Sequence, residues 1–309
     1  MKEHFLELLR RASTVLPDDV AAAVESGRDA EEPGSPARSA LDTVLTNCGL
    51  ARETSRPICQ DTGTNIWYVR HPQSVSQLEL ERDIVAATRL ATKKSYLRPN
   101  AVDSVTGKNS GDNTGRGAPV IHFQQWKKAA VVADVMLKGG GCENVSCQYS
   151  LPSGALGAGR DLEGVRRVLI DAVFQAQGMG CGPGIIGVGV GGDRATSMIE
   201  AKEQLFRLLG DRNPDARLDA LEKRVTAECN ELGVGPMGFR GRTTLMGTRI
   251  GVRHRLPASF FVSIAYMCWA CRRASVKIAG GRATYSQISE IARRYELPAR
   301  QNARQGGAR

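Results

Sequence analysis

Helical and strand patterns alternate along this chain, which predicts an α/β fold with mixed sheets surrounded by helices. Short apolar runs at 120–123, 130–137 and 185–190 have the length of buried strands, and amphipathic stretches of helical length lie between such runs. Glycine-rich stretches separate several of these segments, and we expect two lobes that share them. With 309 residues, the chain is long enough to bury a core in one large domain or two small ones.

The first part of the chain is predicted to be mainly helical. Residues 2–26 carry helical patterns that break at Pro17, where the proline and the acids after it favour a helix start. After this break we expect a loop, a helix, a strand and another helix, over 27–37, about 38–52, 65–69 and 78–95.

Strands and helices are expected to alternate in the rest of the chain, after a long polar stretch. Residues 99–119 are nearly all small and polar, and such a stretch inside a compact domain is usually functional or disordered. We expect Asn213 to cap a helix that begins at Pro214. The predicted strands cover 120–123, 130–137, 185–190, 248–254 and 260–267, and the predicted helices cover 162–177, 194–209 and 214–232.

One domain is expected over residues 1–285, followed by a basic tail over residues 286–309. The end of this tail, residues 300–307, is rich in Arg, Gln and Gly and has too few apolar side chains to pack in a core. We therefore expect the tail to be flexible.

Composition and charge limit the classes of function. No apolar run reaches the roughly 18 residues of a membrane span, and the N-terminus mixes acids into its apolar positions, unlike a signal peptide. We therefore expect a cytoplasmic protein without membrane association, whose eight cysteines are reduced thiols. The net charge of +10 is partly carried by C-terminal arginines, and no basic–aromatic platform for nucleic acid accompanies it. A positive field also suits an enzyme with dianionic substrates.

The most informative segment is a polar turn around Cys59. Cys59, Gln60 and Asp61 are consecutive, and Gly63 closes the turn with a backbone that tolerates positive φ. A thiolate with a carboxylate two residues later can hold a metal and deliver a proton in one small volume. This turn therefore indicates a metal site that performs chemistry.

The other cysteines divide by their settings. Structural zinc needs four clustered ligands, whereas Cys268–Cys271 is the only CxxC and the four histidines lack ligand spacing. Cys181 lies among glycines, and Cys268 lies at the end of a predicted strand. Flanking glycines let backbone N–H groups approach cluster sulfurs, so Cys59, Cys181 and Cys268 suggest an iron–sulfur site. Packing roles are expected for Cys48 and Cys229. Cys142 and Cys147 lie on a polar loop, where a structural role is favoured over metal ligation.

A glycine pattern at 187–192 matches the dinucleotide fingerprint GxGxxG, but its context does not. The fingerprint requires a second strand ending in an acid about 20 residues later, and a helix is predicted there instead. Close backbone packing or a carboxylate site explains these glycines better than the dinucleotide binding of a nicotinamide-dependent dehydrogenase does.

Several motifs together resemble those of the iron–sulfur hydro-lyases, the class I fumarases and the L(+)-tartrate dehydratase alpha subunit. The resemblance runs from about residue 15 to about residue 282 and implies the N-terminal-domain fold of the class I fumarases, with the two lobes around a cluster. The motifs are Cys-Gln-Asp-Thr-Gly at 59–63, Lys-Gly-Gly-Gly at 138–141, Gly-x-Gly-Cys-x-Pro at 178–183, Gly-Val-Gly at 187–189 and Cys-Trp-Ala at 268–270.

This resemblance implies a role for each matching residue. The ligands of a [4Fe-4S] cluster with one open iron would be Cys59, Cys181 and Cys268, and an open iron is a Lewis acid. Substrate contacts would come from Gln60, Asp61, Arg98 and Gly141. A fixed guanidinium such as Arg98 suits a substrate carboxylate.

The chain departs from the family pattern in two places. The family carries a histidine shortly before its third cysteine, and Leu256 stands at the matching place, so His254 is the only substitute. Single-chain fumarases continue into a C-terminal domain that supplies arginines, a lysine and a catalytic threonine. The resemblance therefore implies an alpha subunit that forms a homo- or hetero-oligomer with a beta-type subunit.

The expected reaction is the reversible hydration and dehydration of a small dicarboxylate. Malate/fumarate is the first choice, and tartrate/oxaloacetate or a methylated dicarboxylate are alternatives. Asp61 would transfer a proton at the departing hydroxyl, and Arg98 with the Gly139–Gly141 amides would hold carboxylates. The base for the C–H proton is expected from the partner chain. A rival of another class is a non-catalytic iron–sulfur or nucleic-acid-binding protein.

Overall fold

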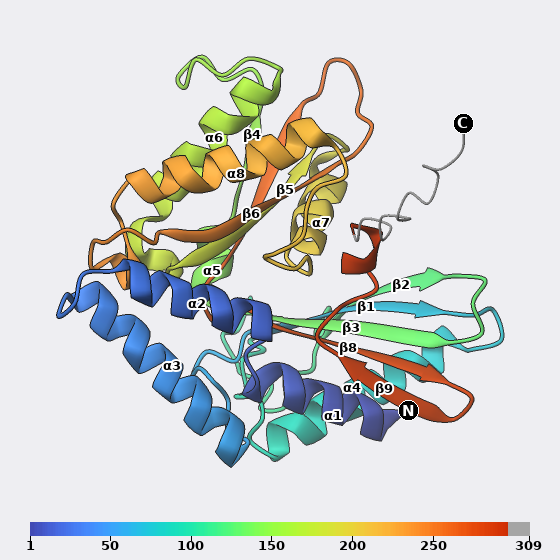
Figure 1. The fold of residues 1–309 in the computed structure, drawn as a ribbon. Helices are drawn as coiled ribbons and strands as arrows, with labels where there is room; N and C mark the ends of the chain where they lie inside the picture. The colour runs from blue at the N-terminus through green and yellow to red at the C-terminus, as the bar shows by residue number, and fades with distance from the viewer. Residues whose placement is uncertain (296–309) are drawn as a thin grey trace, which may run out of the picture.

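The computed structural model describes residues 1–295 and contains two lobes, each built on a mixed sheet with helices packed against it (Figure 1). The first sheet has the strand order β2-β1-β3-β8-β9, and the second has the order β4-β7-β5-β6. Both sheets contain parallel and antiparallel pairs, so the predicted α/β class with mixed sheets is confirmed. No helix within the described residues has the length and apolar character needed to cross a membrane.

The first lobe buries both faces of its sheet. From Asn65 onward, every residue of β1 is buried, and successive side chains enter different cores because strand side chains alternate between faces. On one face Trp67 packs edge-to-face on Phe5 of α1, with ring centroids 5.6 Å apart. The elements of this lobe are α1 (Lys2–Thr14), β1 (Thr64–His71), α4 (Gln77–Lys93), β2 (Val120–Gln125), β3 (Val131–Lys138), β8 (Arg272–Ala279) and β9 (Arg282–Ser286).

The second lobe carries helices on both faces of its sheet, as Figure 1 shows. The glycines of β5 explain one of these packings, because a Cβ at Gly187 or Gly189 would overlap backbone carbonyl oxygens of α7. The Gly-Val-Gly pattern therefore serves close strand–helix packing, as the sequence indicated. The elements are β4 (Cys147–Ser150), α6 (Leu162–Ala176), β5 (Gly184–Val190), α7 (Arg194–Gln204), α8 (Ala216–Glu231), β6 (Leu245–Val252) and β7 (Phe261–Met267).

A third apolar cluster lies between the lobes. It joins side chains of both sheets, such as Ile66 and Ala265, with α2 (Asp18–Ala30) and α3 (Pro36–Thr54). The predicted break at Pro17 is confirmed, since this residue precedes the first turn of α2. The lobes are thus held by shared apolar burial and by the chain segments that cross between them.

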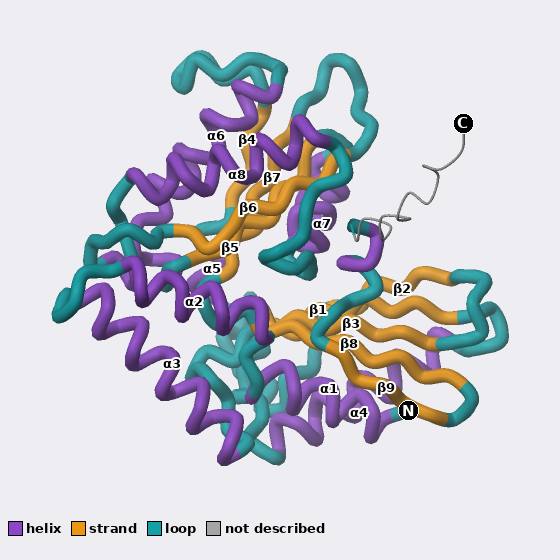
Figure 2. Tube along the Cα trace, in the orientation of Figure 1, coloured by secondary structure: helices purple, strands orange, loops and turns teal. Residues whose placement is uncertain are grey.

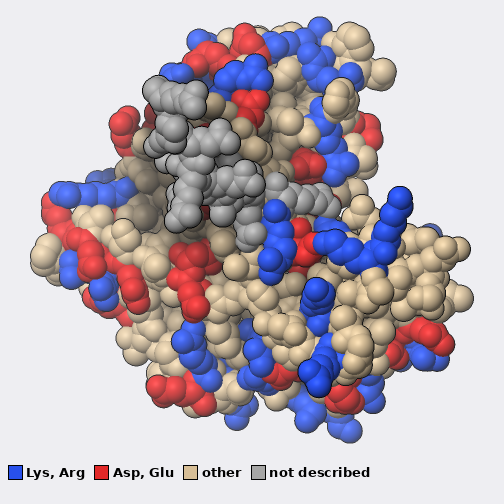
Figure 3. Space-filling model, turned by 45° about the vertical axis from the view of Figure 1, so that its right-hand side comes forward, with Lys and Arg blue, Asp and Glu red and all other residues tan. Residues whose placement is uncertain are grey.

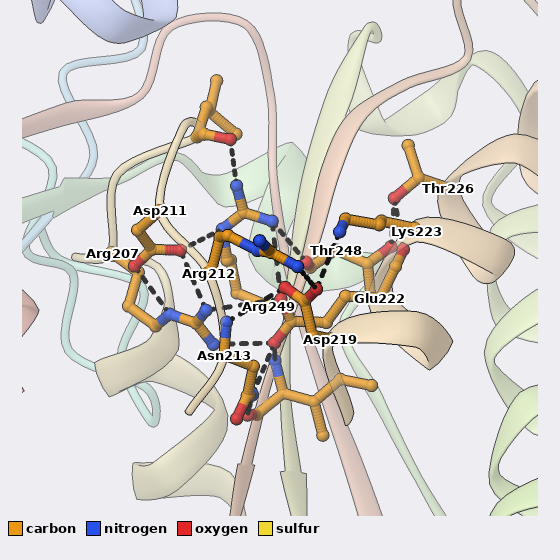
Figure 4. Close-up of polar contacts among 12 residues, drawn as sticks. Arg207, Asp211, Arg212, Asn213, Asp219, Glu222, Lys223, Thr226, Thr248 and Arg249 are labelled. Carbon is orange, nitrogen blue, oxygen red and sulfur yellow. Dashed lines mark hydrogen bonds and ion pairs between the residues drawn. The ribbon is translucent and has the colours of Figure 1, made fainter. Parts of the chain in front are cut away.

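Some sequence-based boundaries were wrong. The helix predicted from residue 194 ends at Gln204, and the next helix is capped by Asp215, whose side chain accepts from the Arg217 amide at 2.9 Å. Asn213 is instead buried, and its amide donates to Glu222 at 2.8 Å. Figure 4 shows this residue in a network of charged and polar side chains from the segment after α7, from α8 and from β6.

Strand β8 was missed because two consecutive arginines suggest an exposed segment. In the structure Arg272 donates to the Leu137 carbonyl at 3.2 Å, and Arg273 pairs with Asp19 at 2.6 Å. Both side chains are buried, since distant residues supply their acceptors. Strands β4 and β9 and the short helix α5 (Gly140–Asn144) were also not predicted.

The chain remains packed beyond residue 285, where the sequence suggested a boundary. Ser289, Ile291 and Ala292 are buried, and Ile291 joins the apolar cluster between the lobes. The packed part of the chain therefore extends past the predicted boundary, and the flexibility expected of residues 286–309 stays a prediction. The rest of that segment, including residues 300–307, lies outside the described residues.

Candidate functional site

Within the described residues, the chain passes from one sheet to the other twice, and the sequence-predicted site residues other than His254 lie at or near these passages. Residues 139–146 lead from β3 to β4, and residues 268–271 lead from β7 to β8 (Figure 2). The Cys59 turn immediately precedes β1, whose first residue Thr64 pairs with Lys138 at the end of β3. Likewise, Cys181 precedes β5, and Ile185 pairs with Met267 beside Cys268. Strand register therefore brings three separate cysteines to one junction.

The Asp61 carboxylate links the first two motifs. Its Oδ1 accepts from the Gly63 amide at 3.0 Å, and its Oδ2 accepts from the Gly140 amide at 2.7 Å. Gly63 has φ +75°, and a Cβ there would lie 2.7 Å from the Lys138 backbone, so only glycine fits. The buried Arg272 donates to the Asp61 carbonyl. The acid is thus held in one orientation while remaining only half-buried.

Cys181 has an unusual backbone conformation. It follows the 3-10 helix η1 (Gln177–Gly180) with φ +53°, which non-glycine residues adopt rarely and mostly at sites under functional constraint. The Tyr266 ring lies so close to Gly180 and Gly184 that a Cβ at either glycine would overlap it. These glycines allow the loop with Cys181 to pack against β7.

The thiols and the acid surround one small region. Burial raises the pKa of Cys181, and the negative forms of Cys142, Cys59 and Asp61 raise it further. The Cys268 amide donates to the Cys142 sulfur at 3.2 Å. Hydrogen bonding from Cys268, assisted by positively charged neighbours, lowers the pKa of Cys142 to about 7 despite its burial.

The donor set fits a cluster better than a single metal ion. Among residues 1–295, no three His, Cys, Asp or Glu side chains are close enough together to bind one metal ion. Thiolates of a four-iron cluster each bind a different iron, so their sulfurs need not converge on one point. Cys268 is buried, while Cys59 and Cys181 are half-buried, which leaves an approach for a small substrate.

Arg98 lies at the open side of this junction. Its Nη1 donates to the Gln60 carbonyl at 3.3 Å, and its backbone amide donates to Thr62 Oγ1 at 2.9 Å. The polar stretch 99–119 supports it, since Asn113 Nδ2 donates to the Arg98 carbonyl at 2.6 Å. Both Arg98 and Gln60 are exposed, so their side chains can meet a ligand.

Gly141 also lies at the junction, whereas His254 does not. A Cβ at Gly141 would lie 3.4 Å from the Met179 carbonyl, next to the Cys181 loop. His254 is exposed beyond the far end of β6, and its carbonyl accepts from Gly192 at 3.2 Å. The seven residues of β5 separate Gly192 from Cys181 by roughly 20 Å. The structure therefore does not bring His254 to the other predicted site residues of this chain.

Sequence reasoning missed three residues at the junction, namely Lys138, Cys142 and Arg272. Each lies next to a recognised motif, but their buried contacts depend on long-range pairing. Lys138, for example, donates to the Tyr266 carbonyl at 2.9 Å. For Lys138 and Arg272, the available signal in the sequence was a charged residue directly beside glycines or a cysteine.

The chain is similar to a known protein family over most of its length. The family model described as fumarate hydratase (Fumerase) matches residues 2–277. A Geobacillus stearothermophilus protein named "Putative fumarate hydratase class I" is 48% identical over 279 residues, which cover 89% of this chain and 54% of the relative. The chain thus spans about half the length of that relative.

Two further relatives are similar over most of their own length. A Methanocaldococcus jannaschii protein named "Putative L(+)-tartrate dehydratase subunit alpha" is 32% identical, with 88% of this chain and 95% of the relative covered. The L(+)-tartrate dehydratase subunit alpha of Escherichia coli K12 is 31% identical, with 86% of each covered.

Proposed function

Because this chain belongs to the fumarate hydratase family, we propose that it is the alpha-type part of an iron–sulfur hydro-lyase. Its reaction is the reversible hydration of a small dicarboxylate, with fumarate and (S)-malate as the first candidates. The observation that carries this proposal is the convergence of three cysteines and the oriented Asp61 carboxylate at one junction. The similarity to the Geobacillus relative favours fumarate.

The residues of the junction suit the steps of such a reaction. A [4Fe-4S] cluster held by Cys59, Cys181 and Cys268 would supply a Lewis acid at the iron that no cysteine binds. Asp61 is oriented by two backbone amides and transfers a proton at the departing hydroxyl. Arg98 is exposed at the open side and pairs with a substrate carboxylate.

Fewer amides of the glycine turn are free to bind a substrate carboxylate than the sequence suggested. The Gly140 amide already donates to Asp61, so it serves the acid and not the substrate. Of the predicted substrate contacts, Arg98, Gln60 and Gly141 remain for the carboxylates.

A second chain is part of the proposal. The two tartrate dehydratase relatives are named as alpha subunits and match this chain over most of their length, while the Geobacillus relative is about twice as long. We infer a beta-type partner, similar to the remaining part of that longer relative, which supplies the base for the C–H proton. The complex would act in the cytoplasm.

The charge distribution supports a small anion as ligand. The net charge is +10, yet basic and acidic side chains are interspersed over the face seen in Figure 3. Excess positive charge of this kind attracts dicarboxylates and an acidic partner chain without a continuous basic surface.

The alternative substrate is L(+)-tartrate, which the two alpha-subunit relatives favour. The test is turnover of fumarate, malate, tartrate and a methylated dicarboxylate by the iron-replete chain with its partner. A preference for fumarate and malate supports the first reading, and a preference for tartrate supports the second. A reconstituted, iron-containing complex that turns over none of them overturns the proposal.

A further inference from the structure

A cluster of three charges lies behind the glycine turn and connects the two lobes. Lys138 ends β3, and its side chain is fully buried, with Nζ 2.6 Å from Glu143 Oε2. The other carboxylate oxygen of Glu143 accepts from Lys202 of α7, which packs on the second sheet. Lys138 also donates to the Tyr266 carbonyl of β7 at 2.9 Å. One carboxylate therefore joins the first sheet, the crossing segment and the second lobe.

This turn needs contacts from outside to keep its shape. It contains three consecutive glycines, 139–141, which have the broadest conformational freedom of any residue. Helix α5 has only five residues, and a helix of this length is not stable alone. Glu143 lies in α5 and pairs with a lysine of each lobe, so it fixes the turn relative to both sheets.

The glycine turn also orients the candidate acid, Asp61. Gly140 lies three residues before Glu143 and donates its amide to Asp61 Oδ2 at 2.7 Å. The Glu143 amide closes the turn by donating to the Gly139 carbonyl at 3.0 Å. A shift of the turn therefore moves the Gly140 amide away from the Asp61 carboxylate.

We propose that Glu143 is a positioning residue, which holds the Gly140 amide against Asp61 by pairing with Lys138 and Lys202. The catalytic part of this inference rests on the proposed function. Glu143 binds the two lysines with its carboxylate oxygens and acts on the reaction only through the turn. Misplacing a reacting group by about 1 Å can lower a rate by about 10²-fold, so a partial loss of alignment should be measurable.

The test compares Glu143→Gln with Glu163→Gln in the iron-replete chain with its partner. Glu163 is a matched control, because its side chain is 44% exposed, against 45% for Glu143. It also pairs with basic residues, namely Arg166, Arg224 and, at 3.9 Å, Arg167. Glu143→Gln should lower kcat about 10-fold or more, with KM changed less than about twofold and iron content unchanged. Glu163→Gln should leave kcat within about twofold of wild type.

Hydrogen exchange gives a readout that does not depend on activity. The peptide containing Gly140 should exchange at least about tenfold faster in Glu143→Gln than in wild type, and at the wild-type rate in Glu163→Gln. Lys202→Met, which removes only the partner on α7, should produce the same change to a smaller extent. Glu143→Asp should restore part of kcat.

Unchanged exchange and unchanged kcat in Glu143→Gln would overturn the inference. Loss of iron from this variant would also overturn it, because Glu143 would then serve cluster assembly. An inactive wild-type complex would refute the proposed function, and the exchange rates would still decide whether Glu143 holds the turn.

Discussion

Glu222 is buried in the second lobe and accepts hydrogen bonds from buried charged and polar groups. Its Oε1 accepts from Arg207 at 2.7 Å and from Asn213 at 2.8 Å (Figure 4). It also accepts from the Ile250 amide at 2.8 Å. The carboxylate is 3% exposed and the Arg207 side chain is fully buried, so water cannot replace this contact. Glu222→Gln keeps the volume and removes the charge, which separates electrostatics from cavity formation.

The expected cost follows from these contacts. Removing one partner of a buried ion pair costs about 3–5 kcal/mol, because the other charge stays buried. Asp211 also binds Arg207, at 2.8 Å, which reduces the loss. The glutamine oxygen can still accept from the Ile250 amide, but the NH2 group replaces Oε2, which accepts from Arg207 Nη2 at 3.3 Å. Donor then faces donor, and an unsatisfied buried polar group adds about 1–3 kcal/mol. We therefore expect the free energy of unfolding to fall by about 3–5 kcal/mol.

Urea denaturation of the cluster-free chain, followed by far-ultraviolet circular dichroism, measures this loss. Lys223→Gln is the control, since Lys223 is the next residue on α8. Its side chain pairs with Asp219 and is 64% exposed. An exposed pair of this kind contributes less than about 1 kcal/mol. A loss in Glu222→Gln no larger than in Lys223→Gln would refute the reasoning.

Four other predictions concern the candidate site and its surroundings. Anaerobic reconstitution should lose iron in alanine variants of Cys59, Cys181 and Cys268, whereas full iron in Cys268→Ala with loss in Cys271→Ala would contradict the third assignment. Iron should be retained in alanine variants of the other five, Cys48, Cys142, Cys147, Cys229 and Cys271. Asp61→Asn should keep the cluster and lower turnover about 10²-fold in the complete enzyme, and near-normal turnover would exclude its acid–base role. The iron-replete chain without its partner should be inactive, so full activity of the chain alone would rule out a missing base. Burial raises the pKa of Asp134 from 3.8 to about 6, although Ser275 and Arg70 oppose this shift. The native state then keeps a proton that the unfolded chain releases, so stability should fall as the pH rises from about 4 to about 6, and Asp134→Asn should abolish that fall.

Much of the fold could be predicted because its signals are local. The break at Pro17, the buried strand β3 and the glycines of β5 follow from propensity, periodicity and the absence of a side chain. The Cys59 turn was also local, since Gly63 has a positive φ and its amide donates to the Asp61 side chain two residues earlier. These features depend on residues within a few positions of one another in the sequence.

Long-range pairing decided what the sequence left open. No strand was predicted at Arg272 and Arg273, but acceptors more than a hundred residues away allow both to be buried in β8. Sheet register likewise decided the site, because it places Cys181 beside Cys268 and puts His254 at the opposite end of the same sheet. The sequence by itself therefore determined the reactive groups and the turns that carry them. Only the tertiary structure decided which of those groups meet. Contacts between distant segments determine which strands are neighbours, and this determines the end of the sheet at which each loop emerges.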